Sequence, residues 1–466
     1  MESSGGVMSA KLAAQRPVAT VESGGAAGVI AAGFVGRLLG AGEVISFDMG
    51  GTTAKAGIVR EGRPAITHDF QVGGKGSFGG TRPGTGFPIK IPVVDMAEVG
   101  AGGGSIAWID GGGALRVGPR SSGAVPGPAC YGRGGEDPTV TDANLLLGYL
   151  NPDGLAGGVT LSVDRSEVAI DRVAGPLGLD RPEAARAIHD IVNANMAAAI
   201  RVVTVQRGID PRTFTLVGFG GAGPMHVGRL AETFGITSVA VPWGAGVASA
   251  IGLVTSDLSV DEVRTRITDE ADLDPATVNG LFDDLTMLGA AKLPPGNDAD
   301  LVISRSADVR YRGQGHQLTV PVPDGALTVD DLATVVKTFG EHYQQTYGIE
   351  ADAPVQLVNF RVRVIRVVDK YQPVPFAGHD DGDTDLGGAG PGAAVATSLP
   401  SRQRQVYFHD LGGFVPTPVH RWVDLRPGSH VQGPAIVEGD DTTVVVPPAF
   451  QATVDRWRSV LLSVPS

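Results

Sequence analysis

The segment from Asp48 to Thr53, Asp-Met-Gly-Gly-Thr-Thr, combines the residue types that phosphate and magnesium chemistry requires. An aspartate at the end of a strand can hold the water shell of Mg²⁺, which prefers oxygen ligands. Gly50 and Gly51 allow main-chain amides to approach phosphate oxygens closely, and the hydroxyls of Thr52 and Thr53 add uncharged donors. The alternative is a β-turn in which Asp48 only caps the bend, and for so short a pattern taken alone this turn is favoured.

A second glycine-rich segment, Gly-Phe-Gly-Gly-Ala-Gly-Pro at residues 218–224, lies between an expected strand and an expected helix. Glycine in such a loop lets a nucleotide lie against the backbone, and the helix N-terminus offers its positive end. The alternative is an ordinary tight turn. The spacing does not fit the dinucleotide fingerprint Gly-x-Gly-x-x-Gly. Two such loops in one domain favour a nucleotide-binding site more strongly than either loop alone.

Three further residues are weaker candidates. Cys130 lacks a neighbouring base in the sequence, so a partly buried thiol is favoured over a nucleophile. Asp142 enters a helix and either caps it or faces a nucleotide, and the sequence leaves both readings open. His226 follows the second glycine loop, and a structural role is favoured for it. The histidines and the single cysteine form no zinc-binding spacing, so no zinc site built by the protein is predicted.

The elements that must position these groups alternate between helices and strands. Apolar periodicity predicts helices at residues 24–39, 180–208 and 225–234, and strands at 43–47, 53–59, 214–219 and 238–243. A second glycine-rich hairpin is expected within residues 95–119. Beyond residue 296 the β-branched segments predict strands, interrupted by one helix at 330–347, with a loop at 377–400. The expected fold class is therefore α/β followed by a β-rich C-terminal domain.

Length and composition restrict the class of protein. With 466 residues, two or three domains are expected, here residues 1–260, a connecting segment at 261–300, and residues 301–466. The net charge of −13 and the lack of basic clusters argue against nucleic-acid binding. One cysteine excludes an internal disulfide framework. Because no signal peptide or membrane span is recognisable, a cytoplasmic protein with no membrane contact is expected.

Several long segments resemble the hydantoinase A/5-oxoprolinase family. They include FDMGGTTAKAGIV, GAGGGSIAWID, LRVGPRSSGAVPGPACYGRGGEDPTVTDANLLLGYL and FTLVGFGGAGPMHV, and, in the C-terminal part, ADVRYRGQGHQLTVPV and GPAIVEGDDTTVVVPP. The resemblance covers nearly the whole chain. It implies an actin-like ATPase fold in which two halves clamp ATP with Mg²⁺, and this chain is expected to supply the second half of that domain.

The resemblance also assigns roles to residues. FDMGGTT matches the second phosphate loop, so Asp48 is expected to be the catalytic acid that orients the Mg²⁺ water shell, with Gly50, Gly51, Thr52 and Thr53 on the phosphates. GFGGAGP matches the adenosine loop, which carries over the three glycines Gly220, Gly221 and Gly223. The family's first Asp-x-Gly-Gly-Thr copy has no counterpart here, so the chain is expected to begin part-way through the subunit. A further departure is Lys55, where many members carry an acid.

The activity implied by the resemblance is ATP-dependent opening of a cyclic amide such as a hydantoin, 5-oxoproline or another lactam. A hydantoinase B-type partner subunit is expected to complete a hetero-oligomer and to supply a metal centre for hydrolysis. The alternatives are the ATP-using subunit of an acetone- or acetophenone-type carboxylase and a non-catalytic scaffold that still binds the partner. A sugar or acetate kinase is less favoured, because those enzymes need both phosphate loops in one chain.

Overall fold

The computed structural model describes residues 1–68, 70–72, 86–154, 158–351, 353–376, 396–397 and 400–465. The chain forms two compact units, each built from separate stretches of sequence. The smaller unit comprises Met1–Val21 and Ser256–Lys370, and the larger unit comprises Glu22–Thr255 and Tyr371–Ser466. Among the described residues, no helix is long and apolar enough to cross a membrane.

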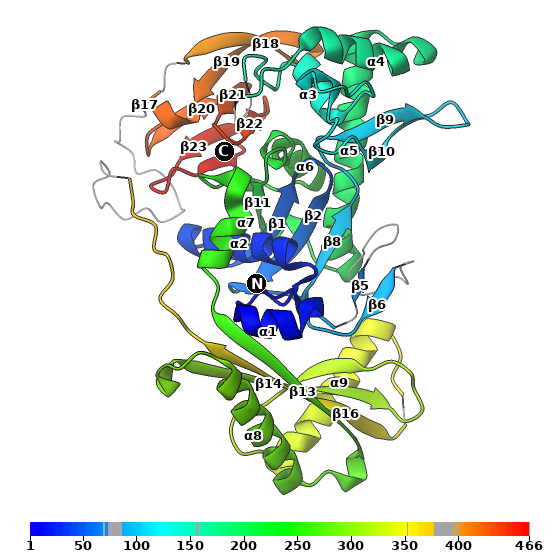
Figure 1. Cartoon of the computed structure of the whole chain (residues 1–466), viewed down its shortest axis with the longest axis vertical. Helices are drawn as coiled ribbons and strands as arrows, with labels where there is room; N and C mark the ends of the chain where they lie inside the picture. The colour runs from blue at the N-terminus through cyan, green and yellow to red at the C-terminus, as the bar shows by residue number, and fades with distance from the viewer. Residues whose placement is uncertain are drawn as a thin grey trace. The chain divides into compact units, whose positions relative to one another are not determined.

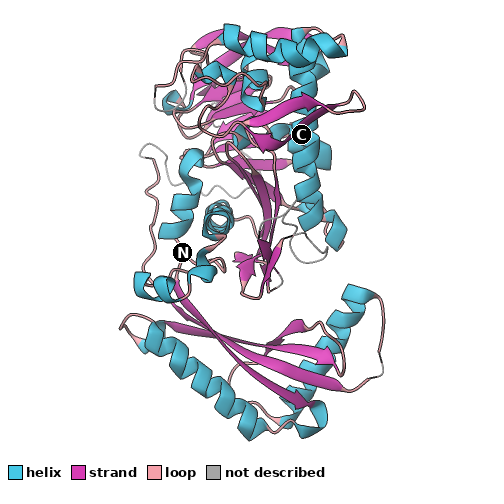
Figure 2. Cartoon of the chain, turned by 45° about the vertical axis from the view of Figure 1, so that its right-hand side comes forward, coloured by secondary structure: helices cyan, strands magenta, loops and turns pink. Residues whose placement is uncertain are grey.

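The larger unit is built on a mixed sheet with strand order β17-β20-β23-β24-β12-β11-β1-β2-β3 (Figures 1 and 2), whose outer strands are β17 (Ala396–Thr397) and β3 (Arg63–Pro64). Strand β1 (Glu43–Met49) pairs in parallel with β11 (Thr215–Phe219), which pairs in parallel with β12 (Ser238–Val241). On its other side β1 forms the predicted hairpin with β2 (Ala54–Arg60). This mixed sheet confirms the predicted α/β class.

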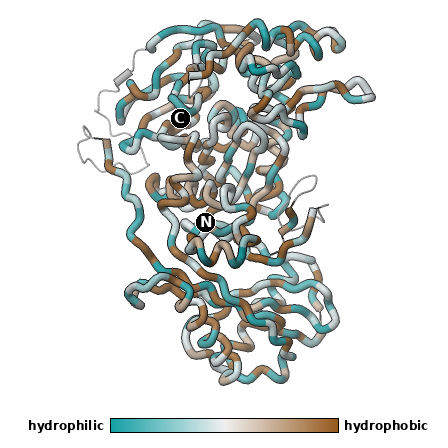
Figure 3. The backbone as a smooth tube through the Cα atoms, viewed as in Figure 1, coloured by the Kyte–Doolittle hydropathy of each residue, from teal (hydrophilic) through white to brown (hydrophobic). Residues whose placement is uncertain are grey.

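Helices cover both faces of this sheet (Figure 2). Helix α2 (Ser23–Leu39) consists largely of small and apolar residues, packs on β1 and β2, and ends at Gly40 in a left-handed cap. Its hydrophobic and neutral colouring is visible in Figure 3. Small residues permit close packing: a Cβ added to Gly252 of α7 (Ala248–Val254) would lie 1.9 Å from the carbonyl oxygen of Ala27.

The predicted long helix is α5 (Arg181–Val203), which packs against β2 and β8 (Met96–Val99). Asp180 begins it with a capping box, in which the Asp180 side chain accepts from the Glu183 amide and the Glu183 side chain accepts from the Asp180 amide. The other helices of this unit are α3 (Val140–Leu146), α4 (Val163–Leu177) and α6 (Val227–Phe234). The second predicted hairpin is confirmed as β9 (Ser105–Ile109) and β10 (Leu115–Ser121).

The C-terminal stretch Tyr371–Ser466 belongs to the larger unit rather than to an independent domain. Strand β24 (Val460–Ser463) pairs with β12, and β23 (Gln451–Val454) and β20 (Ser429–Gln432) extend the sheet from it. A second sheet contains β18 (Arg402–Phe408), β19 (Gly413–Arg421), β21 (Ala435–Glu438) and β22 (Thr443–Val446). The C-terminal region is thus β-rich as predicted, but its strands complete the α/β core.

The smaller unit has a four-stranded antiparallel sheet of β13 (Leu258–Asp269), β16 (Val355–Arg366), β14 (Leu301–Tyr311) and β15 (Leu318–Val322). Helices α8 (Pro275–Lys292) and α9 (Val329–Tyr347) pack on it. Strand β16 alternates buried and partly exposed residues along most of its length. A short helix, α1 (Ala10–Gln15), comes from the N-terminal stretch.

These units differ from the linear division expected from the sequence. Residues 261–300 were expected to connect two domains, but α8 contributes buried residues to the core of the smaller unit and β13 pairs with β16 in its sheet. The expected domain at 301–466 is divided at Lys370, because β16 pairs with β13 and β14 while β24 pairs with β12. The expected loop at 377–400 falls almost entirely outside the described residues.

Candidate functional site

Three loops of the larger unit meet at one edge of its sheet. Strands β1, β11 and β12 are parallel, so their carboxyl ends share this edge, which is where ligands bind in open α/β sheets. Gly50 and Gly51 follow β1, Gly221 and Ala222 follow β11, and Trp243 follows β12. All five line a single cavity of about 880 Å³. The sheet therefore brings both predicted glycine loops to one site.

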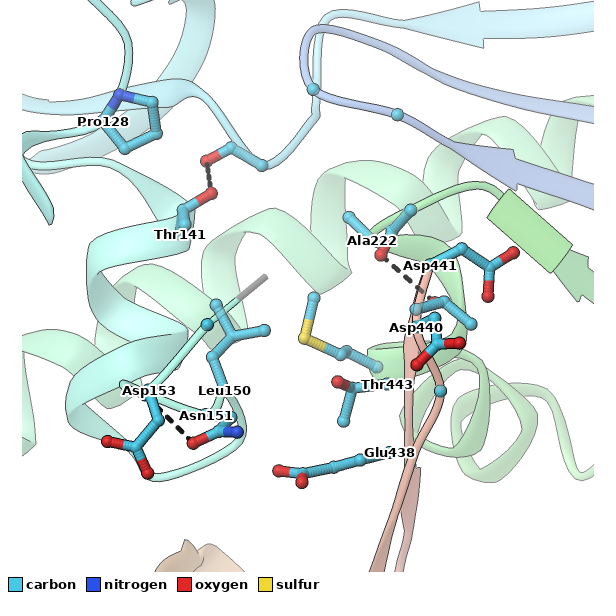
Figure 4. Close-up of a pocket in the computed structure, with 18 of the residues that line it drawn as sticks. Pro128, Thr141, Leu150, Asn151, Asp153, Ala222, Glu438, Asp440, Asp441 and Thr443 are labelled. Carbon is cyan, nitrogen blue, oxygen red and sulfur yellow. Dashed lines mark hydrogen bonds between the residues drawn. The ribbon is translucent and has the colours of Figure 1, made fainter. Parts of the chain in front are cut away.

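Several other segments complete the cavity wall, and two groups of their side chains face each other across it (Figure 4). Thr141, Asn151 and Asp153 lie on one side. The opposite side is formed by the turn between β21 and β22 and by the strand ends that flank it, with the side chains of Glu438, Asp440, Asp441 and Thr443. Thr141 belongs to the polar cluster around Asp142 that enters the expected helix, but the four acidic-side residues were not singled out from the sequence, although the run Gly-Asp-Asp-Thr-Thr lay within a family-like segment. That run gave only a weak signal, because it is equally typical of an ordinary turn.

Main-chain hydrogen bonds hold the loop after β1 in place. The Gly50 amide donates to the carbonyl oxygen of Thr53 at 3.1 Å and closes the turn. The Gly103 amide donates to Gly50 at 3.0 Å, and the Gly104 amide donates to Gly51 at 2.6 Å. The predicted role of the Gly50 amide on a phosphate is therefore not supported, because that amide already has an acceptor. The amides of Gly51 and the residues after it are the better candidates.

The two glycine loops need glycine for different reasons. At Gly50 and Gly51 an added Cβ would meet no atom within 4 Å, and neither residue has a left-handed φ. Protein packing therefore does not require glycine there, whereas a ligand that approaches the backbone would. Gly220 has φ +83°, and a Cβ added to it would lie 2.3 Å from the Met49 carbonyl oxygen. A Cβ added to Gly223 would lie 3.3 Å from the Met49 amide nitrogen.

Of the predicted adenosine-loop glycines, only Gly221 lines the cavity. The nearest atom to an added Cβ there, the Asp441 carbonyl oxygen, is 3.8 Å away, so Gly221 leaves room beside the cavity. Gly220 and Gly223 instead let the loop after β11 pack closely against the end of β1. Thr52 and Thr53 are not lining residues either, although they belong to the same turn as Gly50 and Gly51.

Asp48 lies at the carboxyl end of β1, opposite Phe219 of β11 and Lys55 of β2. Its half-buried carboxylate accepts no hydrogen bond from any group in the described part of the chain. Burial raises the pKa of Asp48 above its ordinary value, and the Lys55 ammonium partly opposes this shift. Lys55 itself ion-pairs with Glu22 at 2.8 Å and Glu98 at 3.7 Å. Asp48 is near the cavity but not among the residues that line it.

The chemistry of the site fits an anion that brings its own divalent cation. No group of three acidic, histidine or cysteine side chains in the described residues could hold a metal ion alone. A single unpartnered carboxylate such as Asp48 suits Mg²⁺, which keeps several waters and binds through one or two carboxylates plus substrate phosphates. The cavity wall is also rich in acids, since Asp153, Glu438, Asp440 and Asp441 outnumber Arg402 and Arg421. A bare polyphosphate would be repelled there.

The turn between β21 and β22 is tied to the loops after β11 and β12. The Thr442 hydroxyl donates to the Gly221 carbonyl oxygen at 3.1 Å, and the Asp441 carboxylate accepts from the Gly246 amide at 2.8 Å. Glu438 pairs with Arg402 at 2.7 Å and with Arg404. These contacts fix the acidic side of the cavity relative to the glycine loops, although the two segments are about 200 residues apart in sequence.

The structure decides the roles of the weaker candidates. Asp142 is fully buried and caps α3, where its carboxylate accepts from the Cys130 amide and the Ser166 hydroxyl, each at 2.8 Å. Cys130 is fully buried rather than partly buried, and burial raises the pKa of its thiol far above the ordinary value, so both features disfavour a nucleophile, as expected. His226 is fully buried as well, and it has the structural role that was favoured for it.

His226 belongs to a buried polar network. Its ring stacks on His189 with centroids 4.6 Å apart, and its Nδ1 lies 3.1 Å from Asn193 Oδ1. Its Nε2 lies 3.3 Å from Asn144 Nδ2, while Asn144 Oδ1 lies 2.8 Å from His189 Nδ1. Burial lowers the pKa of both histidines, that of His189 to about 3, so both rings stay neutral and link α3, α5 and α6.

Comparison with known proteins places this geometry in a family. Residues 1–262 match the family described as hydantoinase/oxoprolinase, and residues 276–463 match the hydantoinase/oxoprolinase C-terminal domain. An uncharacterized protein of Methanocaldococcus jannaschii is 38% identical over 98% of this chain and 64% of its own length. Caprolactamase subunit alpha of Pseudomonas jessenii is 34% identical over 97% of this chain and 63% of its own length.

Solved structures show the same likeness. The crystal structure of ATP-dependent caprolactamase from Pseudomonas jessenii has a TM-score of 0.81 and 32% identity, and the match covers all of this chain and 65% of the other. A nucleotide-free structure of acetone carboxylase has a TM-score of 0.75 and 27% identity, with coverage of 100% and 64%. This chain thus spans somewhat less than two thirds of the length of these relatives. Both segments, the fold and the glycine loops agree: the chain belongs to the hydantoinase/oxoprolinase family.

Proposed function

We propose that this chain is the nucleotide-binding part of an ATP-dependent enzyme that opens cyclic amides. The observation that carries the proposal is the cavity at the shared carboxyl edge of β1, β11 and β12, where Gly50 and Gly51 leave open space that no protein atom fills. The similarity to caprolactamase supports a lactam as the substrate class. Hydantoins and 5-oxoproline belong to the same chemical class of cyclic amides.

The proposed chemistry activates an amide carbonyl, which is a poor electrophile. Attack of the carbonyl oxygen on the γ-phosphorus of ATP releases ADP and leaves a phosphorylated carbon–oxygen bond. Water then adds to the carbon and the carbon–nitrogen bond breaks, so the nitrogen leaves as an amine and an acyl phosphate remains. A second water hydrolyses the acyl phosphate to a carboxylate and inorganic phosphate. In such reactions the protein contributes positioning and charge neutralisation. We assign these tasks to Asp48 through the Mg²⁺ water shell, to the Gly51 amide, and to the hydroxyls of Thr52 and Thr53.

We infer that a second polypeptide segment and a partner subunit complete the enzyme. The acid-rich cavity wall disfavours a polyphosphate without Mg²⁺, and no residue cluster described here could bind a metal for hydrolysis. Several relatives are named as subunits, which supports a hetero-oligomer, and we propose that its partner is of the hydantoinase B type. Neither nucleic acid nor a membrane is proposed as a partner.

Binding of Mg·ATP, measured by isothermal calorimetry, tests the nucleotide assignment. Asp48→Asn preserves the shape of the side chain and removes its charge, so we expect Mg·ATP affinity to fall at least tenfold. Asp324→Asn is the matched control, because it removes one carboxylate from an exposed position in the smaller unit. Equal affinity in wild type and Asp48→Asn would refute the role of Asp48. A wild type that binds no Mg·ATP would refute the proposal in favour of a scaffold.

The substrate class is tested by ATP turnover in the complete complex. Lactams such as caprolactam, hydantoin and 5-oxoproline are expected to stimulate ADP release, and bicarbonate with a ketone is not. Turnover that requires both a ketone and bicarbonate would replace the amidohydrolase proposal with a carboxylase, the alternative that the likeness to acetone carboxylase keeps open.

A further inference from the structure

One tryptophan has surroundings unlike those of a core residue. Trp243 follows β12 at the edge where the nucleotide loops meet, and it lines the cavity. Its side chain is 41% exposed, whereas Trp422 beside it is 1% exposed. The two rings meet edge to face, with centroids 5.5 Å apart and planes at 89°. Trp422 is buried as a core residue, whereas Trp243 keeps a large part of its surface exposed.

Arg458 supports Trp243 from outside the cavity wall. Its guanidinium lies 3.9 Å from the centroid of the Trp243 ring and 4.8 Å from that of Phe376. It also donates to the carbonyl oxygen of Val423, another lining residue, at 3.0 Å. A cation over an indole face is an attractive arrangement that restrains the ring. Trp243 is thus held by its neighbours while still exposing surface to the cavity.

The backbone of Arg458 is strained. Its φ is +65°, and Glu61 is the only other non-glycine residue with positive φ in the part of the chain that the structure describes. The turn is held by the Asp455 carboxylate, which accepts from the amides of Trp457 and Ser459. Strained backbone persists where the surrounding structure imposes it, and such residues cluster at binding sites. Here the strained residue is the one that covers Trp243.

We propose that Trp243 is the surface on which the base of the nucleotide stacks, and that Arg458 is a positioning residue for that ring. This inference rests on the proposed function. Strand β12 is two strands away from β1 in the sheet, so Trp243 and the Gly50–Gly51 turn begin about 10 Å apart. That separation resembles the distance from the middle phosphate of a nucleotide to its base. The adenosine-loop glycines then shape the space between, and the indole supplies the contact with the base.

The test compares two ligands that share phosphates but differ in the base. We measure the affinity of the chain for Mg·ATP and for Mg·tripolyphosphate in wild type, Trp243→Ala and Trp243→Phe. Loss of base–aromatic stacking is expected to weaken Mg·ATP binding by about tenfold or more. Trp243→Phe keeps an aromatic face and is expected to retain most of the affinity. Mg·tripolyphosphate, which has no base, is expected to bind all three proteins equally.

The role of Arg458 is tested by two substitutions that differ in how well they tolerate a positive φ. Arg458→Gly removes the guanidinium and relieves the positive φ, so a weaker Mg·ATP complex cannot be attributed to added backbone strain. We expect a loss of several-fold for Mg·ATP and none for Mg·tripolyphosphate, and Arg458→Lys, which keeps the cation, to lose less. An equal loss for both ligands would overturn the positioning role.

The outcomes separate this inference from the function it rests on. A wild type that binds Mg·ATP, together with a Trp243→Ala variant of unchanged affinity, overturns the stacking role and leaves the proposed function intact. Equal weakening of both ligands in Trp243→Ala also overturns it, because the residue would then act on the shape of the whole cavity. A wild type that binds neither ligand overturns both proposals.

Discussion

Two glycine-to-alanine substitutions, one in each loop, test the reasoning about the site most directly. At Gly220 a left-handed φ costs an alanine about 1–2 kcal/mol, and the added Cβ, 2.3 Å from the Met49 carbonyl oxygen, adds about 1–3 kcal/mol of overpacking. The sum, roughly 2–5 kcal/mol, is a large fraction of the typical stability of a folded protein. We therefore expect Gly220→Ala to lower the free energy of unfolding strongly.

At Gly51 the same change meets open space. No atom lies within 4 Å of the added Cβ, and φ is not left-handed. The free energy of unfolding is therefore expected to stay the same or to rise by about 0.4–1 kcal/mol, because alanine lowers the conformational entropy of the unfolded chain. The methyl group would, however, occupy space that we assign to the ligand. We expect Mg·ATP affinity to fall at least tenfold, which corresponds to about 1.4 kcal/mol of binding free energy.

Urea denaturation followed by circular dichroism measures stability, and calorimetry measures binding. The expected pattern is a stable Gly51→Ala protein that binds poorly and a destabilised Gly220→Ala protein. Wild-type Mg·ATP affinity in Gly51→Ala would refute the argument that this glycine makes room for a ligand. Wild-type stability in Gly220→Ala would refute the close packing between the loops after β1 and β11.

Three further predictions concern the interior of the larger unit. Asp142→Ala leaves buried donors without an acceptor, so urea denaturation should show a loss of about 3 kcal/mol or more, and unchanged stability would contradict the capping role. Burial raises the pKa of Asp455 from 3.8 to about 6, so the stability contributed by its neutral form is complete below about pH 4 and is lost as the pH rises through about 6. Asp455→Asn should therefore remove this part of the pH dependence of unfolding, and an unchanged slope would contradict the assignment. Cys130→Ala should leave ATP turnover of the complete complex unaltered, whereas loss of turnover in a stably folded variant would contradict an inert thiol.

Local elements were predictable because their signals lie within a few residues. The β1–β2 hairpin follows from two apolar runs separated by glycines. Helix α5 follows from an apolar stripe, with Pro182 in its first turn, and the structure adds the capping box at Asp180. In both cases the residues that stabilise the element are neighbours along the chain, so periodicity and turn chemistry suffice to place it.

The role of Asp142 could not be chosen from the sequence. Its capping partner Thr139 is three residues away. The other hydrogen bonds to the Asp142 carboxylate come from the Cys130 amide and from the Ser166 hydroxyl on α4. Similarly, the acidic turn at Asp440 and Asp441 became part of the site only because Thr442 and Asp441 bond the loops after β11 and β12. Contacts between distant segments decide such roles, and periodicity carries no information about them.

The sequence by itself determined the α/β class, the two glycine loops and the family resemblance, because each depends on residue type and short-range spacing. Only the tertiary structure decided the division into units, since the pairing of β24 with β12 and of β16 with β13 joins segments about 100 to 220 residues apart. It also separated glycines that leave open space, Gly50 and Gly51, from Gly220, which packing and a left-handed φ require, and Gly223, where an added Cβ would be tightly packed. A glycine has the same letter in both cases, and only the atoms around its missing side chain distinguish them.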